Sequence, residues 1–528
     1  MIASSVPDEA LVELGSTGGG AGTLALLVRD QDTRRLLLLR AVLDAVDAAD
    51  PAVCPAERKA RLREDWAMLA EADRAPSPAA TPRPPGGRHS PGAPRPSAAH
   101  PGPPGAVHPP SAHHHPPGAV HPPGAVHPPG GALSPARARI FHPLTGPWAL
   151  SCLRGLDHRE RSPDGRGARR LRQDLAHFSA VAAVAAARAG IPFAVRLTAR
   201  AGVLTLPSLG SLRTAAPGDA PVGLGHRDGR LTFRQSGVPD VVVHLESGIG
   251  AWSGALAWTS AHALPGLLPD AAPMPLDDLD PYRGAPGPRH RTLGGPATLD
   301  DADRKRWLQA WSGTAAALRT GGEQRVTEAS ALLRCLVPLE RPPGAGADGR
   351  DSCSATRHEA FGALLASPPQ DAVALAATVV HELHHAKLAA LGDLVTLHHA
   401  GSEARYFAPW KTAPRPYDSL LQGVYSHLAL AEYFQRRALV TPPPDAEYAW
   451  SRHARYRAQV AAALPALVAS PDLTVPGRRF VDEMAAAYER MAEHPAPRDH
   501  TVRAQAYVKA ARALWTQRHA PALPRPKG

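Results

Sequence analysis

The sequence predicts an α+β fold that is mainly α-helical, with a metal site between two helices, a small antiparallel sheet and a long Pro-rich disordered insert. Apolar residues recur at the helical period over most of the chain, and the period changes to two near residues 190–260. Composition indicates the insert, because 19 of the 58 prolines fall within residues 76–130. A packed domain does not accommodate so many breakers of helices and strands.

We expect five regions along the 528 residues. Residues 1–75 form an N-terminal helical segment that docks on the main body. Residues 76–137 form a Pro/Gly/His-rich disordered linker, since Pro-Pro pairs favour extended polyproline II and the segment has little apolar surface to bury. Residues 138–279 form an α+β region that contains the small sheet, residues 280–440 a metal-binding catalytic domain, and residues 441–528 a C-terminal helical region.

The individual elements follow from local patterns. Apolar residues at helical spacing predict two N-terminal helices and a further helical stretch after the linker, and short β-branched runs between Gly, Pro and Asp turns predict strands. The predicted helical segments are 34–43, 61–72 and 155–189, and the predicted strands are 193–198, 202–206, 230–233 and 240–245. Residues 446–518 are expected to be mostly helical, with breaks at Pro465, Pro471 and Pro476.

Two long helices are predicted within the catalytic domain. The first begins near Gln370, where Ser367 three residues earlier fits a capping box, and it continues to about residue 397. Its first half is apolar on all sides, which indicates burial. The second begins near Ser419, which has Gln422 at the capping-box spacing, and continues to about residue 437.

Charge, cysteine usage and hydropathy exclude several classes of protein. The four cysteines are far apart and form no CxxC pair, which disfavours a disulfide scaffold and suits a reducing cytoplasm. We expect neither export nor membrane insertion, because no basic n-region with an apolar core opens the sequence and no apolar run is long enough to span a bilayer. The net charge of +11 comes from arginines scattered among acids, so we expect no nucleic-acid binding.

One motif carries chemistry. His381, Glu382 and His385 match H-E-x-x-H in the middle of the first long helix. Residues four apart lie on one face of a helix, so both imidazoles can reach one metal ion, and Glu382 projects beside them. Burying these groups after an apolar half-helix would be costly without a metal or a hydrogen-bond network. We therefore interpret His381 and His385 as metal ligands.

A mononuclear site needs a third protein ligand, and the second helix offers His427 and Glu432. His427 shares a face with apolar residues and is expected to point inward. Glu432 is five residues later and is turned by about 140° at the usual helical angle, on a face that is also partly apolar. We favour His427 and keep Glu432 as the alternative.

The loop between the two helices, residues 405–417, contains three cations, four aromatic residues and three prolines. Arg405, Lys411 and Arg415 are candidates to hold the carboxylate of a co-substrate, arginine through its planar fork and lysine as a point charge.

These features resemble the HEXXH-motif domain family of actinobacterial peptide-modification proteins. The resemblance is close over about 280–440 and weaker at 34–46. It is carried by Phe361-Gly362-Ala363, His381 to His385, Lys387-Leu388, Ala390-Leu391, Asp393, Tyr406 to Trp410, Pro414-Arg415-Pro416, Leu420 to Tyr425 and His427. Members of this family are understood as iron(II)- and 2-oxoglutarate-dependent oxygenases that hydroxylate the β-carbon of a side chain in a ribosomally made precursor peptide.

The resemblance implies that His381, His385 and His427 hold iron(II) and that Arg415, Lys387 or Lys411 binds 2-oxoglutarate. Such a three-histidine set departs from the more familiar two-histidine, one-carboxylate arrangement. The family usually has another residue at the position of His384, which adds a possible competing ligand here. The implied partners are the precursor peptide and a separate radical SAM peptide maturase, because the four isolated cysteines form no C-x3-C-x2-C cluster.

Two other readings remain open. In an HExxH zinc metallopeptidase the same ligands would hold zinc and Glu382 would be the general base, whereas in the oxygenase Glu382 would orient a ligand or a bound water. The sequence after His385 continues as Ala-Lys-Leu and lacks the extension typical of metzincins. The third reading is a non-catalytic peptide-binding protein with a structural metal.

Overall fold

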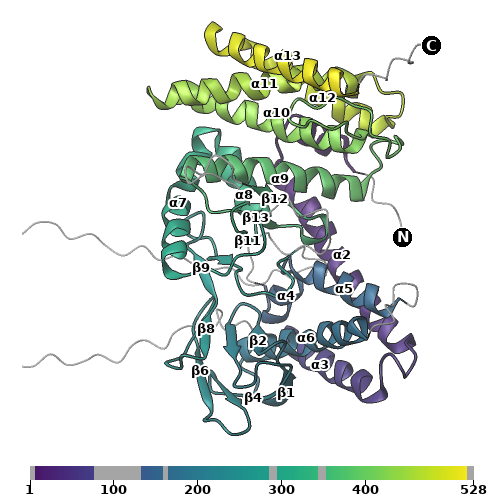
Figure 1. Ribbon diagram of the computed structural model, residues 1–528, viewed down its shortest axis with the longest axis vertical. Coiled ribbons are helices and arrows are strands. Elements are labelled where there is room, and N and C mark those ends of the chain that lie inside the picture. The colour runs from purple at the N-terminus through teal and green to yellow at the C-terminus, as the bar shows by residue number, and fades with distance from the viewer. Residues whose placement is uncertain (1–5, 76–132, 158–164, 285–293, 343–352, 520–528) are drawn as a thin grey trace, which may run out of the picture.

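The computed structural model describes residues 6–75, 133–157, 165–284, 294–342 and 353–519. It has a mixed α/β fold in which helices predominate, as the sequence predicted. Figure 1 shows a lower lobe of helices and antiparallel strands, a middle layer around α9, and an upper layer of C-terminal helices. The predicted linker, 76–137, lies outside the described residues except for its last five, and α4 already begins at Pro135.

Helices form one side of the lower lobe. They are α2 (Ala21–Ala48), α3 (Ala56–Arg74), α4 (Pro135–Ile140), α5 (Thr145–Leu156) and α6 (Arg166–Arg188). Trp148 and Phe178 stack within this bundle, in a core that also contains apolar side chains of α2 and α3. The indole N–H of Trp148 donates a hydrogen bond to the carbonyl of Asp174 in α6 at 2.7 Å. The long α2 also contacts α8 and α9 of the middle layer.

Two antiparallel sheets form the other side of the lower lobe, where the sequence predicted one. The first has the order β1-β4-β5-β6-β7 and the second the order β2-β3-β8. Their strands are β1 (Phe193–Thr198), β2 (Val203–Leu206), β3 (Gly210–Arg213), β4 (Pro221–Arg227), β5 (Arg230–Arg234), β6 (Val241–Leu245), β7 (Ala251–Trp252) and β8 (Trp258–Ser260). The four predicted strands correspond to β1, β2, β5 and β6, and the Ala-rich half of α6 packs on the inner side chains of these sheets.

A third sheet, which the sequence analysis did not predict, lies in the middle layer. Its order is β12-β13-β11-β10-β9, and the pairs β10–β11 and β11–β13 are parallel. The strands are β9 (His262–Leu264), β10 (Met274–Leu276), β11 (Cys335–Pro338), β12 (Ser354–Ala355) and β13 (Ala363–Ala366). All residues of β11 and β13 are buried, so these four-residue strands show no alternation that sequence could reveal.

Three helices complete the middle layer: α7 (Asp301–Thr320), α8 (Glu323–Leu332) and α9 (Ala372–Leu394). The expected capping box of α9 is wrong. Asp371 is the N-cap and accepts from the amide of Ala374, whereas the hydroxyl of Ser367 bonds to Cys353. Asp371 directly precedes the first turn of α9 and is therefore better placed than Ser367 to cap it. Ser367 instead links the end of β13 to Cys353, just before β12, through hydrogen bonds.

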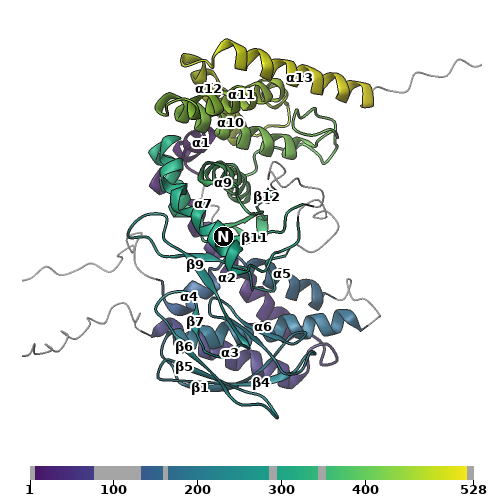
Figure 2. The same ribbon diagram turned by 60° about the vertical axis from the view of Figure 1, so that its left-hand side comes forward.

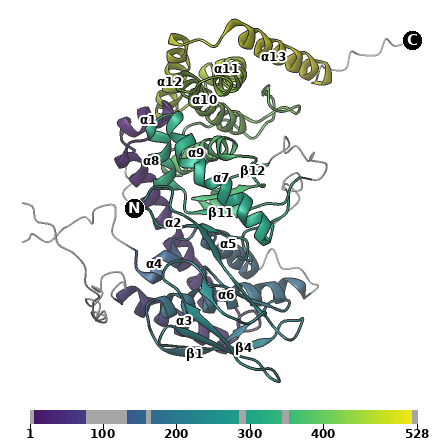
Figure 3. The same cartoon turned by 90° about the vertical axis from the view of Figure 1, so that its left-hand side faces the viewer.

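The upper layer consists of α10 (Tyr417–Val440), α11 (Asp445–Val468), α12 (Val475–Arg490) and α13 (Arg498–His519), and α1 (Asp8–Gly15) packs beside α12 (Figure 3). The predicted break at Pro465 is wrong, because Pro465 lies within the last turn of α11. The capping box predicted for α10 is also wrong: Pro416 is the N-cap position, and Gln422 bonds to a histidine of α9 instead. Among the described residues, no helix is long and apolar enough to cross a membrane.

Candidate metal centre

The two motif histidines lie one turn apart on α9, and His385 contacts Gln422 of α10. Figure 2 shows α10 above α9, and the two helices are in contact. The Nε2 atoms of His381 and His385 are 3.2 Å apart, and the two rings are nearly perpendicular, with centroids 4.6 Å apart. Two acceptor-type nitrogens this close would repel each other without a shared cation or proton. Their separation is of the order expected for two nitrogens bound to one ion at about 2.1 Å.

A hydrogen bond at Nδ1 fixes the tautomer of His385 and of His427. The Nδ1 of His385 lies 3.1 Å from the amide oxygen of Gln422, and the Nδ1 of His427 lies 2.7 Å from the carbonyl of Gly423. In both rings Nδ1 must donate the hydrogen, which leaves Nε2 as the lone-pair nitrogen. The sequence analysis considered Gln422 as a cap and as part of the resemblance, but did not predict its contact with His385.

Burial keeps the rings of His381 and His427 neutral. Desolvation lowers the pKa of His381 well below its usual value and lowers the pKa of His427 to about 4. The Nδ1 of His381 is buried and has no hydrogen-bond partner among the described residues. Neutral imidazoles are the form that binds a metal, so the electrostatics suit a cation at this place.

His427 approaches this pair from α10. The ring centroid of His427 is 5.6 Å from that of His381. The indole of Trp410 stacks on one face of the His427 ring, with centroids 4.4 Å apart. The nitrogens of the three histidines do not all lie within 4.8 Å of one another in this structure. A shared ion would therefore require His427 to move toward the other two rings.

The carboxylate of Glu382 lies close enough to His385 to interact with it electrostatically, but its hydrogen bonds are made to the segment 354–356. It is buried and accepts a hydrogen bond from the Ser354 hydroxyl at 2.6 Å, and Thr356 also donates to it. Burial raises the pKa of Glu382, and these hydrogen bonds only partly offset the effect. In this position Glu382 connects α9 to β12 of the third sheet.

Three other residues named from the sequence belong to a separate buried cluster around Thr17. Glu432, the alternative third ligand, accepts from Arg325 at 2.9 Å. The ammonium of Lys387 lies 3.2 Å from Glu328 and donates to the carbonyls of the Thr17–Gly18 turn. His384 is fully buried and its Nδ1 bonds to the carbonyl of Val380 at 2.6 Å. The structure does not bring these three side chains to the motif histidines.

The loop cations are placed differently from one another. Lys411 is exposed, whereas Arg415 is half-buried and pairs through its backbone with Tyr406. The Nε of Arg415 is buried and unpaired among the described residues. A cavity lies beside His381 and His427, as described below, and neither side chain lines it. The exposed Arg405 contacts Tyr406 and is likewise outside that cavity.

A cavity of about 580 Å³ opens beside His381 and His427. Its far wall is α11, from which four side chains enter at helical spacing: Tyr448, Arg452, Arg455 and Tyr456. The guanidinium of Arg452 lies 5.5 Å from the Tyr456 ring centroid and 5.7 Å from that of Tyr448. No ion pair of Arg452 or Arg455 is present among the described residues.

Sequence reasoning missed this wall, which lies in the region predicted to be a C-terminal helical cover. The available signal was the i, i+4, i+8 spacing of Tyr448, Arg452 and Tyr456, which places them on one face of a helix. That pattern alone does not show which neighbour the face meets.

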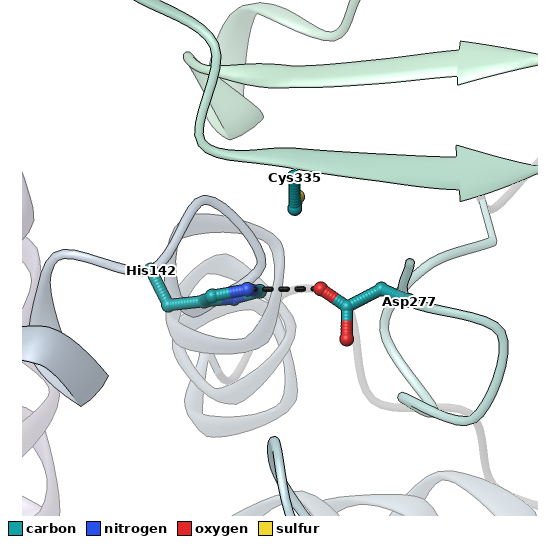
Figure 4. Close-up of side chains that lie close together, drawn as sticks. All are labelled: His142, Asp277 and Cys335. Carbon is teal, nitrogen blue, oxygen red and sulfur yellow. Dashed lines mark ion pairs between the residues drawn. The ribbon is translucent and has the colours of Figure 1, made fainter. Parts of the chain in front are cut away.

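A second group of possible ligands lies where the lower lobe meets the middle layer. In the part of the chain that the structure describes, His142, Asp277 and Cys335 are the one group of three whose ligand atoms all lie within 4.8 Å of one another (Figure 4). The Leu144 amide donates to the Nδ1 of His142 at 3.3 Å, which places the ring hydrogen on Nε2, 2.9 Å from Asp277. Half-buried Arg139 adds positive charge near Asp277. These contacts describe a satisfied polar cluster rather than three free ligands.

Comparisons with known proteins add no identity: no protein-family model matches the chain, and no curated protein matches it.

Proposed function

We propose that the protein is an iron(II)- and 2-oxoglutarate-dependent oxygenase that hydroxylates a β-carbon of a ribosomally made precursor peptide. The observation that carries the proposal is the cavity shared by His381 and His427 with Arg452 and Arg455. It combines neutral imidazoles, which suit a divalent metal, with two arginines that form no ion pair with a carboxylate of the described residues. That is the pairing a site for a metal-binding 2-oxo acid needs.

The residues present fit a metal such as iron(II). His381 and His385 would hold it through Nε2, with His427 as the third ligand. Iron with 2-oxoglutarate supplies oxidation of a C–H bond by dioxygen: one oxygen atom enters the substrate as hydroxyl, and the other appears in succinate as carbon dioxide is released. Gln422 would fix the orientation of His385.

The arginines of α11 would bind the distal carboxylate of 2-oxoglutarate. Arg452 is held between aromatic rings, which pre-orients its planar fork. Charge-assisted hydrogen bonds to a carboxylate are among the stronger polar contacts. We propose Arg452 and Arg455 for this role in preference to Arg415, Lys387 and Lys411, because only the former line the cavity.

The position of Glu382 favours the oxygenase over the zinc peptidase. A zinc peptidase needs Glu382 beside the metal-bound water, whereas here the carboxylate is engaged by Ser354 and does not line the cavity. The precursor peptide as substrate, the separate radical SAM maturase as partner and the cytoplasm as location follow from the resemblance and are part of the proposal.

The test begins with anaerobic loading with iron(II), followed by calorimetric binding of 2-oxoglutarate and by measurement of succinate in air. We expect Arg452→Gln and Arg455→Gln to weaken 2-oxoglutarate binding by about tenfold or more, the loss of about 1.4 kcal/mol that one charge-assisted contact supplies. The exposed Arg479 of α12 gives a matched control, Arg479→Gln. Binding that is equally weakened in the control, or zinc-loaded protein that cleaves a peptide library without iron-dependent succinate, would refute the oxygenase.

A further inference from the structure

The five-stranded sheet of the lower lobe packs on α6 with one face only. The inward side chains lie in a hydrophobic core with the Ala-rich half of α6: Leu197, Val222, Leu224, Leu231, Phe233, Val243 and Ala251. Side chains alternate along a strand, so the residues between them point to the opposite, outer face. Those outward residues are exposed or half-buried. Figure 2 shows β1 and β4 at the lower end of the molecule, below the layer that contains α9.

Strand register arranges the outer face in three rows that run across the strands. The first row, on β4 to β7, is Arg227, Arg230, His244 and Trp252. The second row, on β1, β4, β5 and β6, is Ala194, Gly225, Thr232 and Val242. The third row, on β1, β4 and β5, is Arg196, Gly223 and Arg234. None of these outward positions carries an acid.

The second row forms the floor of a groove between two rows that contain arginines. Its side chains are small and uncharged, and a cavity of about 850 Å³ lies over Gly225 and Thr232. Ligand sites usually measure about 300–1,000 Å³. The arginine rows are four residues apart along the strands, which is about 13 Å at the usual rise per residue. We call this feature the sheet groove.

Gly225 keeps the sheet groove open although nothing within the chain requires a glycine there. Glycine inside a strand weakens it and often marks a place where a ligand or another backbone approaches closely. The pairing of β4 with β1 and β5 is continuous, so no bulge explains Gly225, and its φ is not positive. A Cβ would meet its nearest neighbours, Nη1 of Arg234 and the carbonyl of Phe193, only at 3.8 Å. Close approach by another molecule would account for it.

The charge of the sheet groove is positive on both sides. Three of its arginines are exposed and make no ion pair within the described ranges: Arg196, Arg227 and Arg230. The fourth, Arg234, lies 3.5 Å from Asp240 through its Nε and extends its Nη1 toward Gly225. Asp228, in the turn between β4 and β5, is the one acid that lines the cavity in the described part of the chain. The surface therefore favours an anionic partner.

The two arginine rows distinguish between kinds of anionic partner. An extended peptide directs successive side chains to opposite sides, so a peptide along the floor can offer carboxylates to both rows. Sites for single-stranded nucleic acid combine a charged track for the backbone with several aromatic side chains on which bases stack. Here both sides are cationic, and Trp252 stands at one end of a single row. This arrangement favours an acidic peptide.

We propose that the sheet groove binds an acidic segment of a peptide in extended conformation, with carboxylates on both sides paired to the two arginine rows. Arginine clusters recognise acidic motifs through charge-assisted hydrogen bonds. From β1 to β6 the floor measures about 14 Å, which is about four residues of extended chain. The surface is separate from the metal centre, and only the identification of the bound peptide as the precursor peptide rests on the proposed function.

The probe is fluorescein-labelled hexaglutamate, and its fluorescence anisotropy is measured with the full chain in the absence of metal and 2-oxoglutarate. We expect Arg230→Glu in the first row and Arg196→Glu in the third each to weaken binding by about tenfold or more, because each reverses one interfacial charge. The exposed Arg479 of α12 gives the control for net charge, Arg479→Glu, which should change binding less than about twofold. Equal loss in all three variants, or no binding of hexaglutamate, overturns the proposal.

A second pair of variants tests the shape of the groove without changing its charge. Gly225→Val places a side chain on the floor and should weaken hexaglutamate binding by about tenfold. Gly218 lies in an exposed loop with open space around it, so Gly218→Val should leave binding unchanged. Circular dichroism checks that both variants are folded. Unchanged binding by Gly225→Val overturns the groove in favour of general charge attraction.

Two further probes test the chemistry of the partner. Hexaglutamine has the same backbone without charge and should not bind, and hexauridylate should bind more weakly than hexaglutamate. Equal binding of hexaglutamine, or tighter binding of hexauridylate that both arginine variants weaken, overturns the commitment to an acidic peptide. None of these measurements depends on iron, so failure of the oxygenase proposal and failure of this site are distinguishable.

Discussion

The indole of Trp410 lies stacked on the imidazole of His427, with ring centroids 4.4 Å apart and planes inclined by 18°. Trp410 comes from the loop between α9 and α10, and His427 from the middle of α10. The contact holds one face of the histidine, whose ring centroid is 5.6 Å from that of His381. The loop therefore sets the position of the proposed third ligand without supplying a ligand itself.

Gly423 makes this stacking possible, because a Cβ at that position would lie 2.4 Å from the indole of Trp410. We expect Gly423→Ala to displace the indole and to lower the free energy of unfolding by about 1–3 kcal/mol, as overpacking does. Gly392 of α9 has open space around it, so Gly392→Ala should raise stability by about 0.5–1 kcal/mol. Urea unfolding of both variants measures the difference, and equal effects would contradict the close packing.

The proposed ligands make a prediction about metal content. His381→Ala and His385→Ala should each lose most of the bound iron after reconstitution and dialysis, measured by elemental analysis, while the fold is retained by circular dichroism. Gln422→Leu should weaken metal affinity by about 10–100-fold, because the imidazole of His385 loses its orienting acceptor. The exposed His399 serves as the control, since His399→Ala should leave metal content unchanged. Full metal content in the His381 and His385 variants would refute the site.

A substitution at Glu382 distinguishes the oxygenase from the zinc peptidase. Gln is isosteric and can still accept a hydrogen bond from Ser354, so Glu382→Gln should retain iron-dependent succinate formation within about tenfold. A peptidase would lose nearly all activity, because its general base would be gone. Succinate formation and peptide cleavage measured on the same preparations decide between them.

We expect the buried carboxyl group of Asp280 to make the free energy of unfolding depend on pH. Burial and neighbouring Asp277 raise its pKa to about 6, above the unfolded value of about 3.9. The folded protein therefore binds more protons than the unfolded chain between these values, so this group makes stability fall as pH rises through that window. Asp280→Asn, which can still accept from the Tyr282 amide, should remove this contribution and raise stability at pH 7 by about 3 kcal/mol. Unfolding curves at pH 4.5 and 7 test this, and an unchanged pH slope in the variant would contradict it.

The sequence predicted what depends on local pattern. Period-two segments located β1, β2, β5 and β6, and the helical pattern located α9 and α10 with His381, His385 and His427 on them. Contacts between distant segments were not predictable in this way. Arg452 reaches the cavity because α11 packs on α10, and Gln422 bonds to His385 because α9 and α10 cross at that level.

Local signals also failed where two of them competed. Ser367 and Asp371 both precede α9 and both can cap it, and the aspartate directly before the first turn is the cap in the structure. Pro465 lies three residues before the end of α11 at Val468, so the lost hydrogen bond and the contact of its ring with the preceding turn affect only the end of the helix. The third sheet was missed because its strands are short and wholly buried.

The buried cluster around Thr17 has an evolutionary consequence. Arg325 and Lys387 are balanced there by Glu328 and Glu432, and the Thr17–Gly18 turn completes their hydrogen bonds. Loss of one partner would leave another charge buried and unpaired, at a cost of about 3–5 kcal/mol. These positions are therefore free to change only in concert, and descendants of this sequence should inherit the charged set whole or replace it whole with apolar residues.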